Sequence, residues 1–375
     1  MWSYWEQDTF IQKPDLVVIG SGIVGLSAVI RYAEVYPKHR VMILEAGPLP
    51  TGASTKNAGF ACFGSPTEVL MDLENESEDQ VLARIEKRWK GLENLQQLLG
   101  KENIGLETPG SYELFLKEDQ SLFDQTFSQI DRLNRLIYPT LKRKVYEVHH
   151  SIIEKAGFQG VGSAISINGE GQINTGLMMK NLIDLAKQKH IQILNGYKVT
   201  SISYQADGVN IQGLAGNIHA KKCIIATNGF GKQLLPDLDL KPARAQVLIT
   251  KPIDNLPFKG TFHFDQGYYY FRNVGNRVLF GGGRNLDKDK ETTDKINFNQ
   301  KIQSHLIELL KTHILPNTPF EIDQQWAGIM GIGSTKETLI EKINDNCVIS
   351  LRLGGMGIAI GSLIGREAAE LLMHE

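Results

Sequence analysis

The sequence predicts an α/β (α+β) protein: a Rossmann-like domain around a central parallel sheet, interleaved with a second domain built on a mostly antiparallel sheet. Two observations support this fold class. An apolar run at residues 15–20, helical spacing over 23–35 and a second apolar run at 40–45 form a βαβ unit. Strand-like stretches then fill the second half of the chain, which ends with a strand, a glycine loop and a helix.

The other elements follow from apolar spacing. At 75–99 apolar residues recur every three or four positions among basic ones, which predicts an amphipathic helix. Further helices are expected at 119–142, 175–189, 295–312 and 358–373. Strands are expected at 191–199, 202–204, 209–212, 223–226, 246–251, 262–273, 277–282 and 347–351.

No internal repeat or low-complexity linker separates these elements, so we expect two domains that share the chain by crossing back and forth. The Rossmann-like domain is assigned residues 14–82, 146–240 and 322–375. The second domain is assigned 83–145 and 241–321.

Composition narrows the function classes. The 375 residues are 42% hydrophobic and 22% charged, which is ordinary for a globular protein, and 40 basic against 42 acidic residues leave a net charge of -2. This balance gives no bulk field toward nucleic acid or an anionic membrane, so small-molecule partners are expected. No stretch approaches the roughly 18 apolar residues of a membrane span.

Cysteine and histidine usage points away from metal and disulfide chemistry. The three cysteines are scattered and form no C-x-x-C pair, which favours a reducing cytoplasm. The nine histidines show no metal-binding spacing, so no metal site is predicted. The amino terminus lacks the basic and apolar regions of a signal peptide.

A glycine motif lies between the first strand and the first helix. In such a turn the glycines allow a tight bend and close approach to a pyrophosphate, and the helix N-terminus faces the anion. A glycine-rich turn without a ligand is the alternative. The predicted phosphate-binding residues are Gly20, Ser21, Gly22, Ile23, Val24 and Gly25.

Glu45 lies 20 positions after Gly25, at the end of the next strand. A carboxylate there accepts hydrogen bonds from ribose hydroxyls and disfavours the 2′-phosphate of NADP. The motif by itself does not separate NAD from FAD.

The loop from Gly47 to Phe60 adds a resemblance. Its sequence, GPLPTGASTKNAGF, resembles the stretch after the ribose carboxylate in the D-amino acid oxidase family of FAD enzymes, which includes glycine oxidase, sarcosine oxidase and gamma-glutamylputrescine oxidase. The resemblance implies that FAD is the cofactor and that Ser54, Thr55 and Asn57 wrap its pyrophosphate.

Three further blocks match the family in order and spacing: Ala226–Gly229, the pair 268–272 and 277–283, and Trp326–Gly328 before Gly354–Gly357. Each taken alone is also an ordinary turn or strand. Together they extend the resemblance over nearly the whole chain, and they make the two predicted domains an FAD-binding and a substrate-binding domain. The further FAD-binding residues implied are Ala46, Gly52, Ala53, Ala58, Gly59, Val199, Ala226, Thr227, Gly229, Trp326, Gly328, Gly354, Gly355, Met356, Gly357 and Ile358.

The resemblance implies that the protein oxidises the C–N bond of a small amine or amino acid. In the family a hydride passes from the carbon that bears the amine to flavin N5, and the resulting imine hydrolyses. Gly354–Gly357 leads into the last helix, so its positive end is expected at the N1/O2 edge of the flavin. An ordinary helix start is the alternative reading of this loop.

Substrate-contacting residues are expected on one predicted strand. Alternation places Tyr268, Tyr270 and Arg272 on the same face. By comparison with glycine oxidase, Tyr268 contacts the substrate and Phe60 lies near the amine. Arg272 either binds a substrate carboxylate or is a surface charge, and Arg284 is a second candidate with weaker support.

At two positions the sequence departs from the family, and these departures bear on how a substrate carboxylate is bound, on whether the flavin is covalently attached and on which electron acceptor is used. Met330 stands where glycine oxidase and D-amino acid oxidase carry a carboxylate-binding arginine, and where sarcosine oxidases carry a cysteine joined to the flavin. Leu279 stands at the position of a lysine that promotes reaction with oxygen. We therefore expect a non-covalent flavin, and oxygen or another acceptor takes the electrons. Cys62 is read as a small buried residue, with a flavin-side thiol as the alternative.

Two other functions remain open from the sequence. An NAD-dependent dehydrogenase uses the same glycine motif, but it leaves the blocks near both chain ends unexplained. A flavoprotein without turnover, serving as a binding or scaffold subunit, is the second. A disulfide reductase needs a second dinucleotide motif and a cysteine pair, and the sequence has neither.

Overall fold

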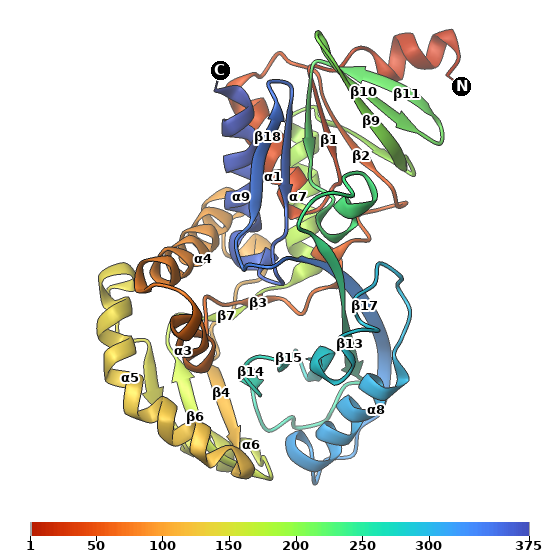
Figure 1. Ribbon diagram of the computed structural model, residues 1–375. Helices are drawn as coiled ribbons and strands as arrows, with labels where there is room; N and C mark the ends of the chain where they lie inside the picture. The colour runs from red at the N-terminus through yellow and green to blue at the C-terminus, as the bar shows by residue number, and fades with distance from the viewer. Residues whose placement is uncertain (1, 375) are drawn as a thin grey trace.

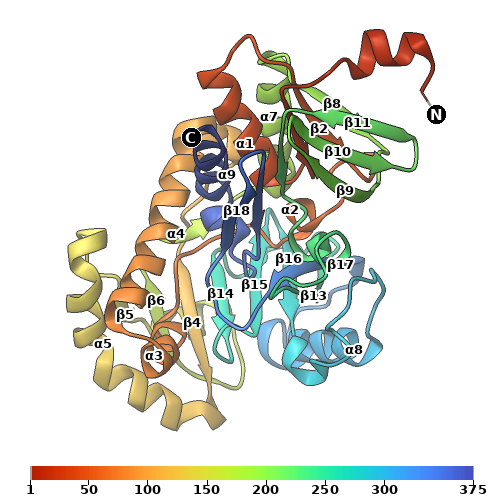
Figure 2. The same ribbon diagram turned by 45° about the horizontal axis from the view of Figure 1, so that its top comes forward.

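Two large sheets organise the chain, and the computed structural model describes residues 2–374. The six-stranded sheet and its helices form the upper part of Figure 1, and the eight-stranded sheet lies below it. Both described ends of the chain lie in the upper part in both views (Figures 1 and 2).

The six-stranded sheet has the order β18-β19-β12-β1-β2-β8. Its neighbouring strands are parallel, except that β18 runs antiparallel to β19. The strands β1 and β2 flank helix α1, which makes the βαβ unit. Their bounds are β18 Leu339–Asn344, β19 Cys347–Leu351, β12 Lys222–Ile225, β1 Leu16–Ile19, β2 Val41–Glu45 and β8 Gln192–Asn195.

Both faces of this sheet are covered. On one face α1 (Ile23–Val35), α7 (Thr175–Gln188) and α9 (Gly357–Met373) bury a shared apolar core, with α4 (Glu78–Leu99) packed on α9. On the other face lies a three-stranded antiparallel sheet. Its strands are β9 Val199–Gln205, β10 Gly208–Gly213 and β11 Gly216–Ala220. Because both faces are buried there, the inner strands β1, β2, β12 and β19 are mostly apolar, whereas the edge strands β8 and β18 carry polar residues.

The eight-stranded sheet has the order β17-β13-β16-β15-β14-β4-β6-β5 and is antiparallel except between β14 and β4. Helix α5 (Gln120–Leu141) covers its β4–β6 end in both views. The strand bounds are β17 Ile322–Ile332, β13 Lys241–Thr250, β16 Arg277–Gly282, β15 Tyr269–Val274, β14 Thr261–Phe264, β4 Ser111–Leu116, β6 Val161–Ile167 and β5 Tyr146–Val148.

The remaining elements connect these sheets. The strands β3 (Phe60–Ala61) and β7 (Gly171–Gln172) form a separate two-stranded sheet within these connections. The other helices are α2 Ala53–Lys56, α3 Pro66–Asn75, α6 Ser151–Ala156 and α8 Gln300–Leu309. The short helical turns are η1 Glu6–Ile11, η2 Glu102–Ile104, η3 Lys117–Asp119, η4 Asn228–Gln233, η5 Arg284–Asp287 and η6 Leu310–Ile314.

The predicted fold class is confirmed: the chain is α/β, with a mainly parallel sheet and a mainly antiparallel one. The helix at 23–35 and the strands at 277–282 and 347–351 have the predicted bounds. The helix expected at 75–99 is confirmed as α4, which begins three residues later, at Glu78, because Ser77 and Gln80 form a capping box at its N-terminus.

Two predicted strands are wrong as single elements, because each of them contains a turn. The predicted strand 191–199 breaks at Gly196, whose φ of +74° ends β8 before β9 begins. The predicted strand 262–273 is a hairpin of β14 and β15. Asp265, Gln266 and Gly267 all have positive φ there, and such residues make a turn.

We retain the two-domain division as a proposal. Three of its segments include elements that belong to, or pack on, the sheet of the other domain. Strands β5 and β6 lie in the segment 146–240 but belong to the eight-stranded sheet, as does β17 in the segment 322–375. Helix α4, in the segment 83–145, packs on α9 of the six-stranded sheet. In residues 2–374 no helix is both long and apolar enough to cross a membrane.

Candidate active site

A cavity of about 1460 Å³ lies where the two large sheets approach each other. The six-stranded sheet contributes the carboxyl ends of β1, β2 and β12, where ligands bind in doubly wound folds. The N-terminal ends of α1 and α9 and the loop 50–60 complete this part of the wall. The eight-stranded sheet closes the cavity from the other side with β13–β17.

The N-terminus of α1 opens into the cavity. Its N-cap residue, Gly22, has no side chain that could cap the first turn, although Ile23 N donates to Ser54 Oγ. A Cβ atom at Gly22 would lie 2.9 Å from Ser54 Oγ, and one at Gly25 would lie 2.0 Å from the Gly20 carbonyl oxygen. Gly22 therefore keeps the helix end open, and Gly25 lets the helix pack closely against the preceding turn.

Glu45 stands at the end of β2 and lines the cavity. Its Oε2 accepts hydrogen bonds from Ser21 N (3.1 Å) and Ser21 Oγ (2.5 Å), and its Oε1 accepts one from Gly47 N (2.9 Å). Ser21 itself is fully buried and does not line the cavity. It holds the carboxylate at the cavity edge.

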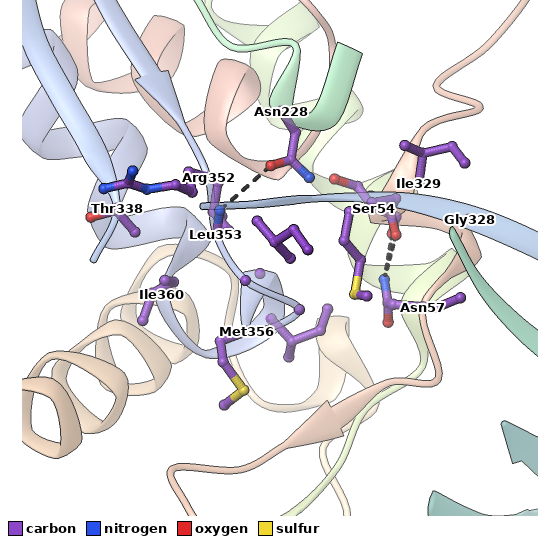
Figure 3. Close-up of a pocket in the computed structure, with 18 of the residues that line it drawn as sticks. Ser54, Asn57, Asn228, Gly328, Ile329, Thr338, Arg352, Leu353, Met356 and Ile360 are labelled. Atoms are coloured by element: carbon purple, nitrogen blue, oxygen red, sulfur yellow. Dashed lines mark hydrogen bonds between the residues drawn. The ribbon is translucent and has the colours of Figure 1, made fainter. Parts of the chain in front are cut away.

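The loop with α2 turns under the cavity through local hydrogen bonds. Ser54 Oγ accepts from Ile23 N at 2.9 Å, which ties the loop to the start of α1. Asn57 Nδ2 donates to Ser54 O at 2.9 Å (Figure 3). Asn57 Oδ1 accepts from Gly59 N at 2.8 Å. Both side chains therefore shape the backbone of this part of the cavity wall.

The block after β12 supports the loop before α9. Asn228 Oδ1 lies 3.5 Å from Leu353 N, a weak hydrogen bond that joins the two segments (Figure 3). Thr227 lines the cavity, and its buried Oγ1 has no partner among the described residues. A Cβ at Gly354 would meet open space, and the N-terminus of α9 has no side-chain cap.

These observations fit a dinucleotide. Two uncapped helix N-termini offer N–H groups and positive dipole ends to one cavity. Glu45 offers carboxylate oxygens to a ribose, and the unpaired Thr227 hydroxyl has room for a ligand partner.

On the eight-stranded sheet, strand register decides which side chains share a row. His263 is paired with Tyr270, Tyr270 with Gly281, and Gly281 with Val247. Directly paired residues lie on the same face, so these four form one row, and His263, Tyr270 and Val247 line the cavity. Tyr268, just before β15, also lines it.

Phe60 joins this row from the opposite wall. Its ring lies 4.9 Å from that of His263 and 5.6 Å from that of Tyr270, both edge to face. The three rings make an aromatic cluster (Phe60, His263 and Tyr270). Burial raises the pKa of Tyr270 to about 12 and lowers that of His263 to about 4, so both groups are neutral at pH 7.

Arg272 lies on the same face but outside the cavity. Its Nε donates to Ala58 O at 2.5 Å, and its Nη2 donates to Ile173 O at 3.0 Å. The side chain is 6% exposed, and burial lowers its pKa to about 10. The guanidinium is thus used to fix the loop that precedes Phe60, and the expectation that it binds a substrate carboxylate finds no support in this geometry.

The two departures from the family occupy different places. Met330 lines the cavity, and its Sδ would lie 3.2 Å from a Cβ at Gly355. Leu279 is buried in an apolar cluster with Ala58 and Val247 and does not line the cavity. Cys62 lines the cavity as a free thiol. Burial, with the charges of Glu170 and Glu68, raises its pKa.

Most of the predicted site residues meet at this one cavity. Of the predicted substrate-contacting residues, Phe60, Tyr268, Tyr270 and Met330 line it. Predicted cofactor-binding residues that do not line it are Ser21, Gly25, Thr55, Gly229 and Trp326. Such a residue can still support the wall. Trp326 Nε1, for example, donates to the backbone oxygen of Lys56, which lines the cavity, at 2.9 Å.

Sequence reasoning missed several residues of the wall. His263 and Asn228 carry no sequence signal of their own, because their places depend on strand register and on a long-range hydrogen bond. An ion-pair group (Glu68, Asp72, Arg84, Arg88 and Lys336) also lines the cavity. Its helical members appeared only as polar positions of amphipathic helices.

The depressed His263 pKa predicts a pH effect on stability. Between pH about 4 and 6.5 the unfolded chain binds a proton at this site that the folded protein does not, so stability falls as pH falls through this window. From pH 7 to 5, His263→Gln is expected to lose about 1 to 2 kcal/mol less stability than the unaltered protein. Urea unfolding of the holoproteins at both pH values measures this, and parallel losses would contradict the buried neutral imidazole.

Comparisons with known proteins agree with this geometry. The family model described as DAO, FAD dependent oxidoreductase, matches residues 15–371. The probable oxidoreductase OrdL of Rhizobium meliloti is 25% identical over 382 residues, covering 96% of this chain and 83% of the relative.

Solved structures show the same fold. Glycine oxidase from Geobacillus kaustophilus has a TM-score of 0.77 at 17% identity, covering 96% of this chain and 94% of that one. L-proline dehydrogenase from P. horikoshii has a TM-score of 0.76 at 16% identity, with coverage of 96% and 94%.

Proposed function

Because the chain belongs to the DAO family of FAD-dependent oxidoreductases, we propose that it oxidises the C–N bond of a small amine or amino acid. The electrons pass to oxygen or to another acceptor. The observation that carries the proposal is that the aromatic cluster and the two uncapped helix N-termini face one cavity. The NAD-dependent alternative loses its basis, since the family uses FAD.

Different predicted cofactor-binding residues would hold different parts of FAD. Glu45 would hold the ribose, and Gly22 with the first turn of α1 would hold the pyrophosphate. The loop 354–358 at the start of α9 would lie at the flavin ring. When bound, FAD supplies the acceptor for the hydride that leaves the substrate carbon.

The chain's own residues orient the substrate. Phe60 and Tyr270 form an apolar wall that excludes water and aligns the C–H bond. The neutral imidazole of His263 makes no hydrogen bond with residues 2–374, so it is available to accept one from the substrate amine. The positive end of α9 stabilises negative charge that develops at the neighbouring part of the cavity.

We further propose that the cofactor is held without a covalent bond. Met330 offers a thioether, which is not a nucleophile for this linkage, and the raised pKa keeps the Cys62 thiol protonated. Acid precipitation is therefore expected to release the yellow colour into the supernatant. Colour that stays with the precipitate would contradict this proposal.

An anaerobic reduction assay tests the function. The holoprotein is mixed with glycine, sarcosine, D-amino acids, proline, putrescine and gamma-glutamylputrescine, and the flavin band near about 450 nm is followed. Bleaching by one class of amine is expected. A yellow protein that none of them bleaches would overturn the proposed activity and favour a scaffold subunit.

A further inference from the structure

Arg284 differs from the other arginines of the cavity wall. Arg84, Arg88 and Arg352 each form an ion pair with a carboxylate of this chain. Arg284 is only partly exposed and lines the cavity, yet its guanidinium makes no hydrogen bond or ion pair with any residue of the described range 2–374. A sheltered guanidinium without a partner has its five donors free for a ligand.

Two glycines bring Arg284 to this wall. Gly282 has a φ of +121°, and a Cβ there would lie 2.0 Å from the Tyr268 carbonyl oxygen. Gly283 has a φ of +74°, and its N–H donates to the same oxygen at 2.9 Å. The end of β16 therefore turns tightly around Tyr268, and Arg284 begins η5 at the cavity.

Arg284 lies away from the aromatic cluster along the sheet. Gly281 is in the row of His263 and Tyr270, β16 ends one residue later at Gly282, and Arg284 follows the turn, so it joins the cavity wall outside that row. A carboxylate next to the amine-bearing carbon would stay near the cluster. A carboxylate at the far end of a short chain would reach toward Arg284.

We propose that Arg284 binds a carboxylate of the substrate and that several bonds separate this carboxylate from the oxidised C–N bond. The substrate class is then a small amine with a remote carboxylate, that is, an ω-amino acid. This inference rests on the proposed function and specifies its substrate. A guanidinium binds a carboxylate with two parallel hydrogen bonds, which neither Met330 nor the buried Arg272, whose Nε and Nη2 donate to backbone carbonyls, provides.

A binding measurement tests the residue without turnover. Pentanoate is titrated into the holoprotein, and the change in flavin absorbance gives its Kd. Arg284→Gln is expected to weaken binding at least about tenfold, as the loss of a charge-assisted pair implies. Lys288→Met is the matched control, because Lys288 is exposed, lies 5.5 Å from the Tyr268 ring and does not line the cavity.

The control should change Kd less than about twofold, since an exposed charge is screened by water. Equal Kd values for Arg284→Gln and the unaltered protein would overturn the proposal. Arg284→Lys provides a second variant, should the first fail to fold. Lysine keeps the positive charge but cannot form two parallel hydrogen bonds, so a partial loss of pentanoate affinity is expected. An unchanged Kd would also overturn the assignment.

Anaerobic flavin reduction then tests the substrate class. The unaltered protein is expected to bind 5-aminopentanoate more tightly than pentylamine, and Arg284→Gln to lose that preference. If the protein instead prefers glycine, and Arg284→Gln keeps this preference, the proposal of a remote substrate carboxylate is overturned. If no amine reduces the flavin, the proposed function fails, while the pentanoate titration still decides whether Arg284 is an anion site.

Discussion

Gly22→Asp is expected to give a folded protein that purifies without FAD. Gly22 is the N-cap of α1 and has extended backbone (φ -70°, ψ 179°), which is open to aspartate once the Ser54 hydroxyl, 2.9 Å from the new Cβ, rotates away. An N-cap aspartate accepts hydrogen bonds from the first-turn N–H groups. It would therefore take the donors that the pyrophosphate needs and place a negative charge beside the phosphates, so FAD affinity should fall at least about 100-fold.

Gly176→Asp is the matched control for this change. Gly176 lies in the first turn of α7, its φ is ordinary, and it does not line the cavity. The measurement is the ratio of flavin to protein absorbance after purification, followed by titration with FAD. If Gly22→Asp retained the normal ratio, the N-terminus of α1 would not be the phosphate site.

Arg272→Met is expected to destabilise the protein by about 3 kcal/mol. The substitution removes two charge-assisted hydrogen bonds and leaves the carbonyl groups of Ala58 and Ile173 without their donor. Ala58 and Ile173 are both buried, so water does not readily replace the guanidinium. Urea unfolding gives the change in the free energy of unfolding.

Arg277→Met provides the comparison. Arg277 is on the neighbouring strand, is about a third exposed and pairs with Asp323, so a loss of about 1 kcal/mol or less is expected. The same Arg272→Met protein also separates two roles. An unchanged stability with weaker pentanoate binding would show that Arg272 is a substrate ligand, contrary to its position here.

Local sequence determined the nucleotide-binding half of the molecule. The strand, the glycine turn and the helix at 23–35 follow from apolar spacing and from the position of the glycines between strand and helix. The position of Glu45 followed from the predicted end of the second strand. The resemblance to the FAD family could also be seen without coordinates, since its blocks keep their order along the chain.

The substrate side of the cavity was decided by tertiary structure. Alternation placed Tyr268, Tyr270 and Arg272 on one face, but it did not tell which of them reaches the cavity. The hairpin turn at Asp265–Gly267, read as continuous strand from its β-forming neighbours, puts His263 opposite Tyr270. Arg272 donates to two carbonyl groups from distant segments, whereas Arg284 has no hydrogen-bond or ion-pair partner among residues 2–374. Pairing between strands and between distant polar groups sets these contacts, and neither is encoded in the spacing of residues along one segment.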